Sequence, residues 1–329
     1  MKLASLKKGG RDGALVVVSR ELDRFVEVPN VATTMQQALD NWAHAAPRLN
    51  RVYEQLDQGN ADDVNDLDAA ALAAPLPRGY EFLDGSAYLP HVERVRRARG
   101  AEVPDSFYTD PLMYQATSAG FLGPKDDMVA VSEEHGIDLE AEIVVVTDDV
   151  PMGVDARRAE RHIQLIGLVN DVSLRNLIPG ELAKGFGFMQ SKPRSSLSPV
   201  FVTPDELGRY WHHGKVDLPL VSHINGKLFG YPEAGHDMQF SFPELIVHAA
   251  RTRPLVAGTL IGSGTVANQD TSLGASCLAE KRMLEVIEHG KARTPFLQFG
   301  DRVHIAMRDP DDRSIFGAIE QEVVPLRAG

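Results

Sequence analysis

The chain has 329 residues, of which 43% are hydrophobic and 24% charged, the composition of an ordinary globular protein with one large domain or two. A formal net charge of −12 disfavours nucleic acid and anionic membranes as partners. The single cysteine, Cys277, excludes an intrachain disulfide and a zinc site built from cysteines. No apolar run approaches the roughly 20 residues of a membrane helix, and no apolar signal-peptide core develops, so we expect a cytoplasmic protein.

The first 75 residues are predicted to form a small α+β domain. Residues 1–30 alternate short apolar runs with glycine-containing turns, which favours hairpins. Apolar positions over residues 33–47 fit one helix that ends at Pro47, and those over 49–56 suggest a second helix. An acidic, alanine-rich passage up to Pro75 is interpreted as a linker.

Residues 76–329 are predicted to form a second, larger domain in which strands and glycine-rich loops dominate. Helical patterns are brief, so a doubly wound nucleotide-binding fold is disfavoured, and no dinucleotide or phosphate-loop fingerprint is complete. We expect an α+β, mostly β fold with a mixed, largely antiparallel core. The strand-like runs are 128–132, 140–147, 163–170, 198–202, 220–224, 255–261, 302–307 and 315–323, and the helix-like runs are 91–99, 157–162 and 242–252.

Two glutamates stand at the start of the most apolar of these runs. Glu140 and Glu142 are two positions apart, so in a strand both side chains leave the same face. Like charges side by side repel, and a carboxylate removed from water needs a partner. A divalent cation that prefers oxygen ligands, Mg²⁺, Mn²⁺ or Ca²⁺, would satisfy both. The alternatives are a solvated strand edge and neutralisation by arginine or lysine.

A third acid follows the next apolar run. Asp171 ends the segment HIQLIGLVND and would point into the cleft that the following loops build. It is equally compatible with a turn or cap aspartate. Together with the two glutamates it would complete an all-oxygen shell that leaves coordination positions for water and substrate.

An acid and an imidazole form a second constellation. Asp84 and His91 are seven residues apart in EFLDGSAYLPH, across a glycine and a proline that can turn both into one pocket. A neutral imidazole beside a bound substrate is a natural general base near pH 7. The chain has 11 histidines, and spacing alone does not choose His91 over His135 or His162.

Two loops supply further polar candidates. Lys192, in QSKPRSSLSPVF, could stabilise an enolate or carbanion as negative charge develops, or could be a solvent lysine ahead of a proline. Gly262, Gly264 and Thr265, in GTLIGSGTVAN, could bring backbone N–H groups and a hydroxyl to a ligand carboxylate, or could form a tight turn only.

In this order the segments resemble the fumarylacetoacetate hydrolase family, from about residue 80 to the end of the chain. The family pattern is an acid with a histidine seven residues on, E-x-E, Asn-Asp followed by arginine, lysine before a Ser-Pro strand, and a late S-G-T. The matching residues are Asp84 and His91, Glu140 and Glu142, Asn170-Asp171 with Arg175, Lys192 before Ser198-Pro199, and Ser263-Gly264-Thr265.

The resemblance implies a small N-terminal domain on a larger mixed β-sheet roll, usually assembled as a dimer. It implies that Asp84, Glu140, Glu142 and Asp171 hold Mg²⁺ or Ca²⁺, with Mn²⁺ possible for the oxygen shell. The remaining implied roles are His91 as the water-activating base, Lys192 as support for the departing carbanion, Glu280 as the orienter of His91, and Tyr114, Arg175 and Thr265 as ligands of substrate oxygens.

The implied reaction is hydrolysis of a carbon–carbon bond in a 1,3-dicarbonyl acid, for fumarylacetoacetate to fumarate and acetoacetate in aromatic catabolism. Family lyases that decarboxylate oxaloacetate-type acids or hydrate 2-oxo-alkenoates are the alternative, and Asp84 favours hydrolysis. A non-catalytic protein with solvated carboxylates is the third reading. Ser86 stands where the animal enzymes carry an aromatic residue, and Gly100, next to Arg99, stands where a substrate-binding arginine is expected, so the substrate is the open question.

Overall fold

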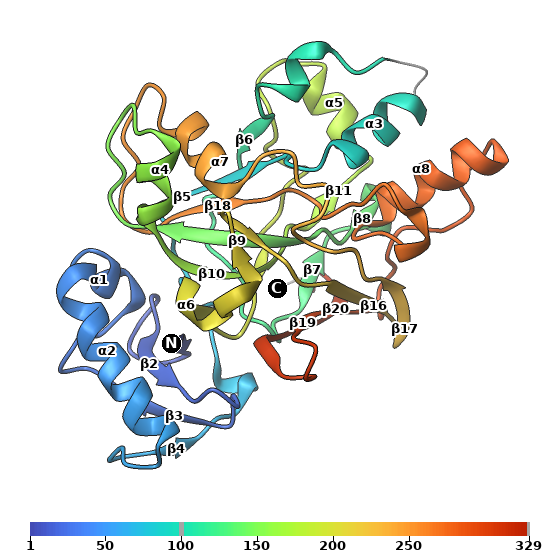
Figure 1. Ribbon diagram of the computed structural model, residues 1–329. Helices are drawn as coiled ribbons and strands as arrows, with labels where there is room; N and C mark the ends of the chain where they lie inside the picture. Colours follow the sequence, from blue (N-terminus) through green and yellow to red (C-terminus); the bar gives the residue numbers. More distant parts are fainter. Residues whose placement is uncertain (99–101, 328–329) are drawn as a thin grey trace.

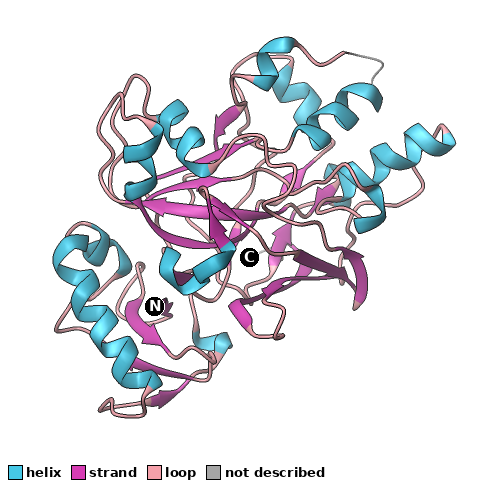
Figure 2. Cartoon of the chain, in the orientation of Figure 1, coloured by secondary structure: helices cyan, strands magenta, loops and turns pink. Residues whose placement is uncertain are grey.

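The computed structural model describes residues 1–98 and 102–327. Strands occupy the middle of the molecule and helices surround them (Figures 1 and 2). The α+β, mostly β expectation is confirmed. Among the described residues, no helix combines the length and the apolar character needed to cross a membrane.

One large mixed sheet and one smaller sheet form the framework. In spatial order the large sheet contains β4 (Asn65–Asp66), β3 (Arg24–Glu27), β2 (Ala14–Val18), β1 (Lys2–Leu6), β13 (Phe201–Val202), β10 (Ile163–Asn170), β9 (Ala141–Thr147), β18 (Thr259–Gly262), β5 (Glu81–Gly85) and β6 (Met113–Gln115), with β12 (Ser196–Leu197) also paired to β10. The second sheet contains β17 (Lys227–Gly230), β16 (Leu220–Ile224), β19 (Arg302–Arg308), β20 (Ser314–Pro325) and β7 (Met128–Ala130). Two short pairs join β8 (Ile137–Asp138) to β11 (Ser173–Leu174) and β14 (Trp211–His212) to β15 (Lys215–Val216).

The helices are short except for α2 and α8. In chain order the helices are α1 (Met35–Leu39), α2 (Trp42–Asp57), α3 (Leu89–Ala98), α4 (Ala156–Ala159), α5 (Ile178–Leu182), α6 (Pro204–Leu207), α7 (Phe242–Ala249) and α8 (Leu278–His289). In Figure 1, α1 and α2 accompany the N-terminal strands, whereas α3, α5 and α8 lie at the opposite side of the molecule.

The prediction that Pro47 ends a helix is wrong. Pro47 lies inside α2, and the break between α1 and α2 comes earlier, at Asp40 and Asn41. Interior proline removes one backbone hydrogen bond and costs about 3 kcal/mol in an isolated helix. Buried α2 side chains such as Leu49 and Tyr53 recur at helical spacing, and their packing on the N-terminal strands outweighs that cost.

The N-terminal strands continue the main sheet. β1 pairs with β13 through Lys2↔Val202 and Leu3↔Phe201, which joins the first hairpins to the centre of the molecule. Because one sheet contains strands from both sides of residue 75, the predicted domain boundary at this residue stays a prediction.

Strands β9 and β10 form the centre of the large sheet. They pair antiparallel from Ile163↔Thr147 to Asn170↔Ala141, and every residue of β9 is buried. A continuous β-branched run suits a strand that is covered on both faces. Ile143 and Val145 belong to one hydrophobic cluster, and Val144 and Val146 belong to another.

Strand β18 brings distant segments to one end of this sheet. It runs antiparallel to β9 and parallel to β5, with Gly262 in register with both Val144 and Asp84. The acid at the end of β5, the glutamate at the start of β9 and the loop after β18 therefore meet at one place.

Helix α8 was not predicted. It begins after Cys277, and the backbone N–H groups of Leu278 and Ala279 donate to the buried carboxylate of Asp138 at 2.7 and 2.8 Å. A carboxylate at a helix N-terminus satisfies otherwise free donors and complements the helix dipole. Helix α8 packs against α3, and both carry residues of the candidate site.

Candidate functional site

Three carboxylates from three elements converge at the end of the large sheet. Asp84 lies near the end of β5, Glu142 lies near the start of β9, and Asp171 follows β10. Each offers an oxygen, and the three oxygens lie within 4.8 Å of one another. The three residues are 4%, 0% and 1% exposed, which excludes a solvated strand edge.

Glu142 lacks any donor in the described part of the chain. Both of its carboxylate oxygens are buried and accept no hydrogen bond. Burial, followed by the charges of Asp84 and Asp171, raises the pKa of Glu142 well above its ordinary value. Burial and the neighbouring Asp171 likewise raise the pKa of Asp84 to about 7.

These surroundings fit a divalent cation. A buried carboxylate without a donor, such as Glu142, is costly, and three buried acids around one point repel one another. A hard dication that takes carboxylate oxygens removes both penalties. The three acids thus form a candidate metal centre.

Gly262 gives the carboxylates their space. A Cβ atom at this position would collide with Oδ1 of Asp84 and would lie 3.0 Å from Oε2 of Glu142. The glycine is therefore required by the side chains that meet beside it rather than by a turn.

Glu140 lies beside the three-acid cluster but has many protein partners. Its Oε1 accepts from Ser173 at 2.5 Å and from Lys192 at 2.9 Å, and its Oε2 accepts from Thr265. The guanidinium of Arg175 lies 3.2 Å from Oε1. Burial alone would raise the pKa of Glu140, but Arg175 and Lys192 hold it well below its ordinary value. Its role as a metal ligand stays a prediction.

Lys192 is buried between two acids. Its Nζ donates to Glu140 at 2.9 Å and to Oδ2 of Asp171 at 2.6 Å, and the residue is 7% exposed, which excludes a solvent lysine. Burial opposes the charge, but Asp171 and Glu140 raise the pKa of Lys192 above its ordinary value. The ammonium therefore stays charged beside the candidate metal centre.

Asp171 is fixed by two further hydroxyl groups. The hydroxyls of Ser195 and Tyr114 donate to its Oδ1 and Oδ2, each at 2.5 Å. Burial and the nearby Asp171 raise the pKa of Tyr114 well above its ordinary value, so this phenol remains a donor.

His91 is oriented by an acid from α8. Its Nδ1 lies 2.7 Å from Oε2 of Glu280, and Nη1 of Arg94 donates to Oε1 of Glu280 at 2.6 Å. Glu280 is fully buried, whereas the His91 side chain is 16% exposed. A carboxylate on Nδ1 selects the tautomer whose Nε2 is free to accept a proton.

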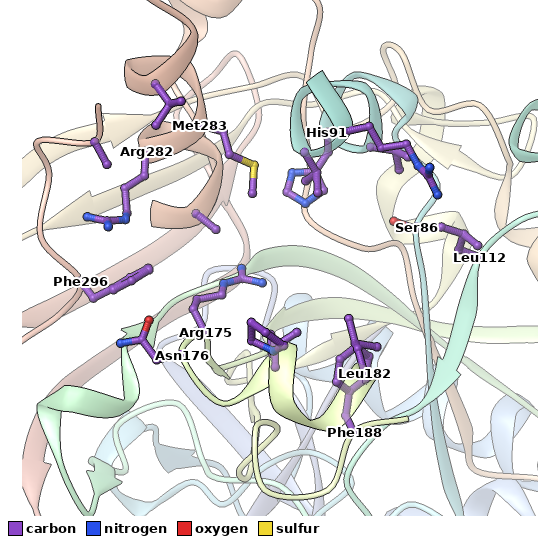
Figure 3. Close-up of a pocket in the computed structure, with 18 of the residues that line it drawn as sticks. Ser86, His91, Leu112, Arg175, Asn176, Leu182, Phe188, Arg282, Met283 and Phe296 are labelled. Carbon is purple, nitrogen blue, oxygen red and sulfur yellow. The ribbon is translucent and has the colours of Figure 1, made fainter. Parts of the chain in front are cut away.

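A cavity of about 730 Å³ opens in front of His91 and Arg175. In Figure 3 the two side chains reach into it from opposite sides, His91 from α3 and Arg175 from the segment before α5. The lining residues are Ser86, His91, Val92, Val95, Arg96, Phe107, Leu112, Arg175, Asn176, Ile178, Pro179, Leu182, Phe188, Ala279, Arg282, Met283, Val286, Ala292 and Phe296.

Arg175 connects the cavity to the acids. Its Nε donates to Asp138 at 2.8 Å, and its Nη2 faces Glu140. Burial disfavours the guanidinium charge, but Glu140 and Asp138 raise the pKa of Arg175 well above its ordinary value. Arg175 therefore contacts both Asp138, which caps α8, and Glu140, which lies beside the candidate metal centre, and it also lines the cavity.

The structure distinguishes His91 from the other two candidate histidines. His162 pairs with Asp148 at 2.6 Å, and His135 lines a separate cavity beside β7. Ser86 lines the large cavity. Arg99 and Gly100, on which the expected substrate arginine depends, lie outside the described residues.

The predicted substrate ligands are placed differently from one another. Arg175 lines the cavity, whereas the hydroxyls of Tyr114 and Thr265 donate to Asp171 and Glu140. Their roles toward a substrate stay predictions.

Sequence reasoning missed Asp138 and Arg94. Asp138 precedes Glu140 by two positions and continues the same alternation of acids. Arg94 follows His91 by three positions, which places both on one face of a helix. Either signal could have been found from spacing, but the partners of these residues come from distant segments.

Comparison with known proteins gives two family matches. Residues 82–324 match the model described as fumarylacetoacetate (FAA) hydrolase C-terminal, and residues 1–78 match fumarylacetoacetase N-terminal domain 2. Over 256 residues the chain is 25% identical to oxaloacetate tautomerase FAHD2B, mitochondrial, of Bos taurus, covering 67% of this chain and 78% of that protein.

Solved structures share the fold. Fumarylacetoacetate hydrolase from Exiguobacterium antarcticum is 16% identical with a TM-score of 0.67, over 99% of this chain and 100% of that one. Maleylpyruvate hydrolase from Sphingobium sp. SYK-6, in complex with manganese(II) ion and pyruvate, is 15% identical with a TM-score of 0.66 over the same shares.

Proposed function

The chain belongs to the fumarylacetoacetate hydrolase family, a family of enzymes, and on this premise we propose that it is a metal-dependent hydrolase of a carbon–carbon bond in a 1,3-dicarbonyl acid. Fumarylacetoacetate is the reference substrate of this proposal. The observation that carries it is Glu142, a buried carboxylate that accepts from no donor among the described residues and faces two further acids.

Asp84, Glu142 and Asp171 would hold the cation, with Glu140 beside them as the fourth predicted ligand. We propose Mg²⁺ or Ca²⁺, with Mn²⁺ as a further oxygen-seeking ion. When bound, such an ion polarises a carbonyl and stabilises the enolate charge that develops as the bond breaks.

His91 would take the proton from the attacking water at Nε2. Glu280 holds Nδ1 and stabilises the imidazolium that forms, while Arg94 balances the charge of Glu280. The arrangement resembles the base-and-orienter pairs of other hydrolases in its geometry, with the acid fully buried and the base at the cavity wall.

Two cations would act on negative charge during the reaction. Lys192 keeps a charged ammonium between Glu140 and Asp171, where it can stabilise the departing carbanion. Arg175 would hold a substrate carboxylate at the cavity wall. The hydroxyl groups of Tyr114 and Thr265, which donate to Asp171 and Glu140, would turn to donate to substrate oxygens instead.

A steady-state assay of the purified protein tests the proposal. We expect hydrolysis of fumarylacetoacetate or an acylpyruvate that is lost with a chelator and regained with Mg²⁺, Mn²⁺ or Ca²⁺. His91→Ala should keep cation binding and lose turnover. Turnover that persists in excess chelator would contradict the role of the metal. Full activity of His91→Ala would contradict the assignment of His91 as the base.

The second candidate is tautomerisation or decarboxylation of a 2-oxo acid such as oxaloacetate. The similarity to a protein named oxaloacetate tautomerase favours it. The same assay with oxaloacetate separates the candidates, because carbon–carbon hydrolysis consumes water and yields two acids, whereas tautomerisation yields an isomer.

Assembly as a homodimer and a cytoplasmic location belong to the same proposal. They rest on the family resemblance and on the expectation from the sequence. Light scattering of the purified protein tests the first, and fractionation of cells tests the second.

A further inference from the structure

The wall of the large cavity carries positive charge and, among the described residues, no negative charge. Its permanently charged residues are Arg96, Arg175 and Arg282, and no aspartate or glutamate of the described chain lines it. This balance is opposite to that of the whole chain, which has a formal net charge of −12. A cavity lined by charge of one sign concentrates ligands of the opposite sign, so the wall indicates an anionic ligand.

Of the three arginines, only Arg175 forms an ion pair with an acid of the described chain. Its guanidinium lies 2.8 Å from Asp138 and 3.2 Å from Glu140, and both acids are buried. The charge of Arg175 is therefore balanced inside the protein, and a ligand carboxylate would share it with two fixed acids. The unbalanced positive charge of the cavity lies at Arg96 and Arg282.

Arg96 is compensated in part by its own helix. It lies in the last turn of α3, where the carbonyl groups of the helix end carry partial negative charge that stabilises a cation. Its Nη1 donates to the carbonyl of Glu102, and its guanidinium lies 4.6 Å from the centre of the Phe107 ring.

Arg282 receives no such compensation. It lies in the N-terminal half of α8, whereas the helix dipole offers partial negative charge only at the opposite end. Glu285, one turn along the same helix, accepts instead from Arg293 and Thr294. Arg282 therefore keeps a positive charge that no acid of the described chain balances.

One edge of the Arg282 guanidinium is also without an acceptor in the described part of the chain. Nη1 donates to the carbonyl of Thr294, and the group lies 4.3 Å from the centre of the Phe296 ring, which leaves Nε and Nη2. These two nitrogens form the edge that binds a carboxylate through two parallel hydrogen bonds. Arg78 uses the same edge in this chain, where its Nε and Nη2 donate to Asp12 at 2.7 and 2.6 Å.

Arg282 lies at one end of the cavity. In Figure 3, Arg282 and Phe296 lie to one side of His91 and Arg175, and Ser86 lies to the other side. A substrate whose reacting carbonyls lie near His91 would extend past Arg175 to reach Arg282. The uncompensated cation is thus placed for the part of the substrate that lies away from the reacting carbonyls.

We propose that Arg282 binds the far carboxylate of a dicarboxylic 1,3-dicarbonyl substrate and thereby selects diacids over monoacids of the same length. This inference rests on the proposed function, which places the dicarbonyl head at the three acids and His91. Arg282 determines specificity and contacts no reacting atom, so its loss should weaken binding of the diacid and leave binding of the head unchanged.

Binding of two matched ligands that lack the second carbonyl tests the proposal without turnover. 2-Oxoheptanedioate and 2-oxoheptanoate share the 2-oxo acid head and the chain length, and only the first ends in a carboxylate. Calorimetric titration with saturating Mg²⁺ should show at least about tenfold tighter binding of the diacid by the wild type. Equal binding of the two, or tighter binding of the monoacid, would overturn the role of Arg282. Binding of neither ligand would overturn it together with the metal-bound head of the proposed function.

A pair of matched variants assigns the preference to Arg282. Arg282→Met keeps the aliphatic stem, and it should reduce the diacid preference to about threefold or less while 2-oxoheptanoate binds as it does to the wild type. Arg209→Met is the control, because Arg209 also lies over an aromatic ring, that of Tyr210 at 5.0 Å, but is exposed and outside the cavity.

Three results of this comparison would contradict the assignment. They are a wild-type preference in Arg282→Met, an equal loss of preference in both variants, and a loss of 2-oxoheptanoate binding in Arg282→Met. Arg282→Lys keeps the charge without the two-nitrogen edge and should retain an intermediate preference.

Turnover separates this inference from the proposed function. Fumarylpyruvate should be hydrolysed with at least about tenfold higher kcat/KM than crotonylpyruvate, in which a methyl group replaces the far carboxylate. Chelator-sensitive hydrolysis of both compounds with equal kcat/KM overturns the role of Arg282 and leaves the hydrolase proposal intact. Tighter binding of 2-oxoheptanedioate without hydrolysis of either acylpyruvate does the reverse.

Discussion

Glu140 and Glu142 leave the same face of one chain segment, yet their surroundings are opposite. Glu140 accepts from hydroxyl groups and from Lys192, so its negative charge is balanced inside the protein. Glu142 faces Asp84 and Asp171 and accepts from no described donor. A dication would balance the charges of these three acids, so removal of a bound cation with a chelator should be measurable as a loss of stability.

Glu142→Gln should stabilise the metal-free protein while it removes cation binding. The amide relieves repulsion among three buried acids, and we expect the free energy of unfolding in chelator at pH 8 to rise on the order of 1 kcal/mol. Urea unfolding measures it. Glu134→Gln, at an exposed acid, serves as the control. A Glu142→Gln protein less stable than the wild type in chelator would show that the acid is not strained.

Glu280→Gln should lower kcat at least about 100-fold and leave the cation affinity unchanged. The amide keeps the shape but cannot stabilise the imidazolium of His91, so the pH dependence of kcat should change as well. Glu285→Gln is a matched control on the same helix, because Glu285 is also buried but accepts from Arg293 and Thr294 instead. Equal kcat losses in both variants would indicate a structural role for Glu280.

At the scale of single residues, spacing predicted the converging acids. The alternation of Glu140 and Glu142 and the position of Asp171 at the end of a strand follow from local periodicity. Local spacing could not identify His91 among the histidines, because that choice depends on Glu280, which lies 189 positions away in sequence. The division of the acids between a donor-rich and a donor-free environment likewise depends on segments far apart in the chain.

At the scale of elements, a short loop sets the position of Lys192. Glu181, near the end of α5, accepts from the backbone N–H groups of Met189, Gln190 and Ser191 and from the Ser191 hydroxyl. Burial opposes ionisation, but these donors lower the pKa of Glu181 to about 2. The carboxylate therefore closes the loop that leads directly to Lys192.

Glu181→Gln should destabilise the protein by about 1–3 kcal/mol near neutral pH. Because the folded pKa is depressed, the stabilisation is fully present above the unfolded value of about 4.5 and is lost as the pH falls toward about 2. Urea unfolding at several pH values should show the difference between wild type and variant shrinking over this window. A difference that stays constant below pH 4.5 would contradict the assignment.

Elements with strong periodicity were predicted well. The runs 163–170 and 220–224 coincide with β10 and β16, because their apolar patterns match a buried strand and a paired strand. Helix α8 was missed, and Pro47 was given too much weight. Helix α8 depends on Asp138, which caps it from another segment, and helix α2 depends on packing against the N-terminal strands.

At the scale of the whole molecule, the site depends on the continuity of one sheet. β10, β9, β18 and β5 are consecutive neighbours, and each ends or begins beside the carboxylates. The mixed sheet, with β18 parallel to β5, was not predicted in detail, because parallel pairing between residues 81–85 and 259–262 has no local signature. The mixed β-sheet roll was predicted from the family resemblance and not from periodicity.

Titration of Mn²⁺ followed by electron paramagnetic resonance tests the central claim most directly. We predict one tightly bound Mn²⁺ per wild-type chain, displaced by excess Mg²⁺ or Ca²⁺, and no tight binding in Glu142→Gln, with Glu134→Gln binding as the wild type does. Equal Mn²⁺ binding by Glu142→Gln and the wild type would contradict the claim that the three acids form a metal centre.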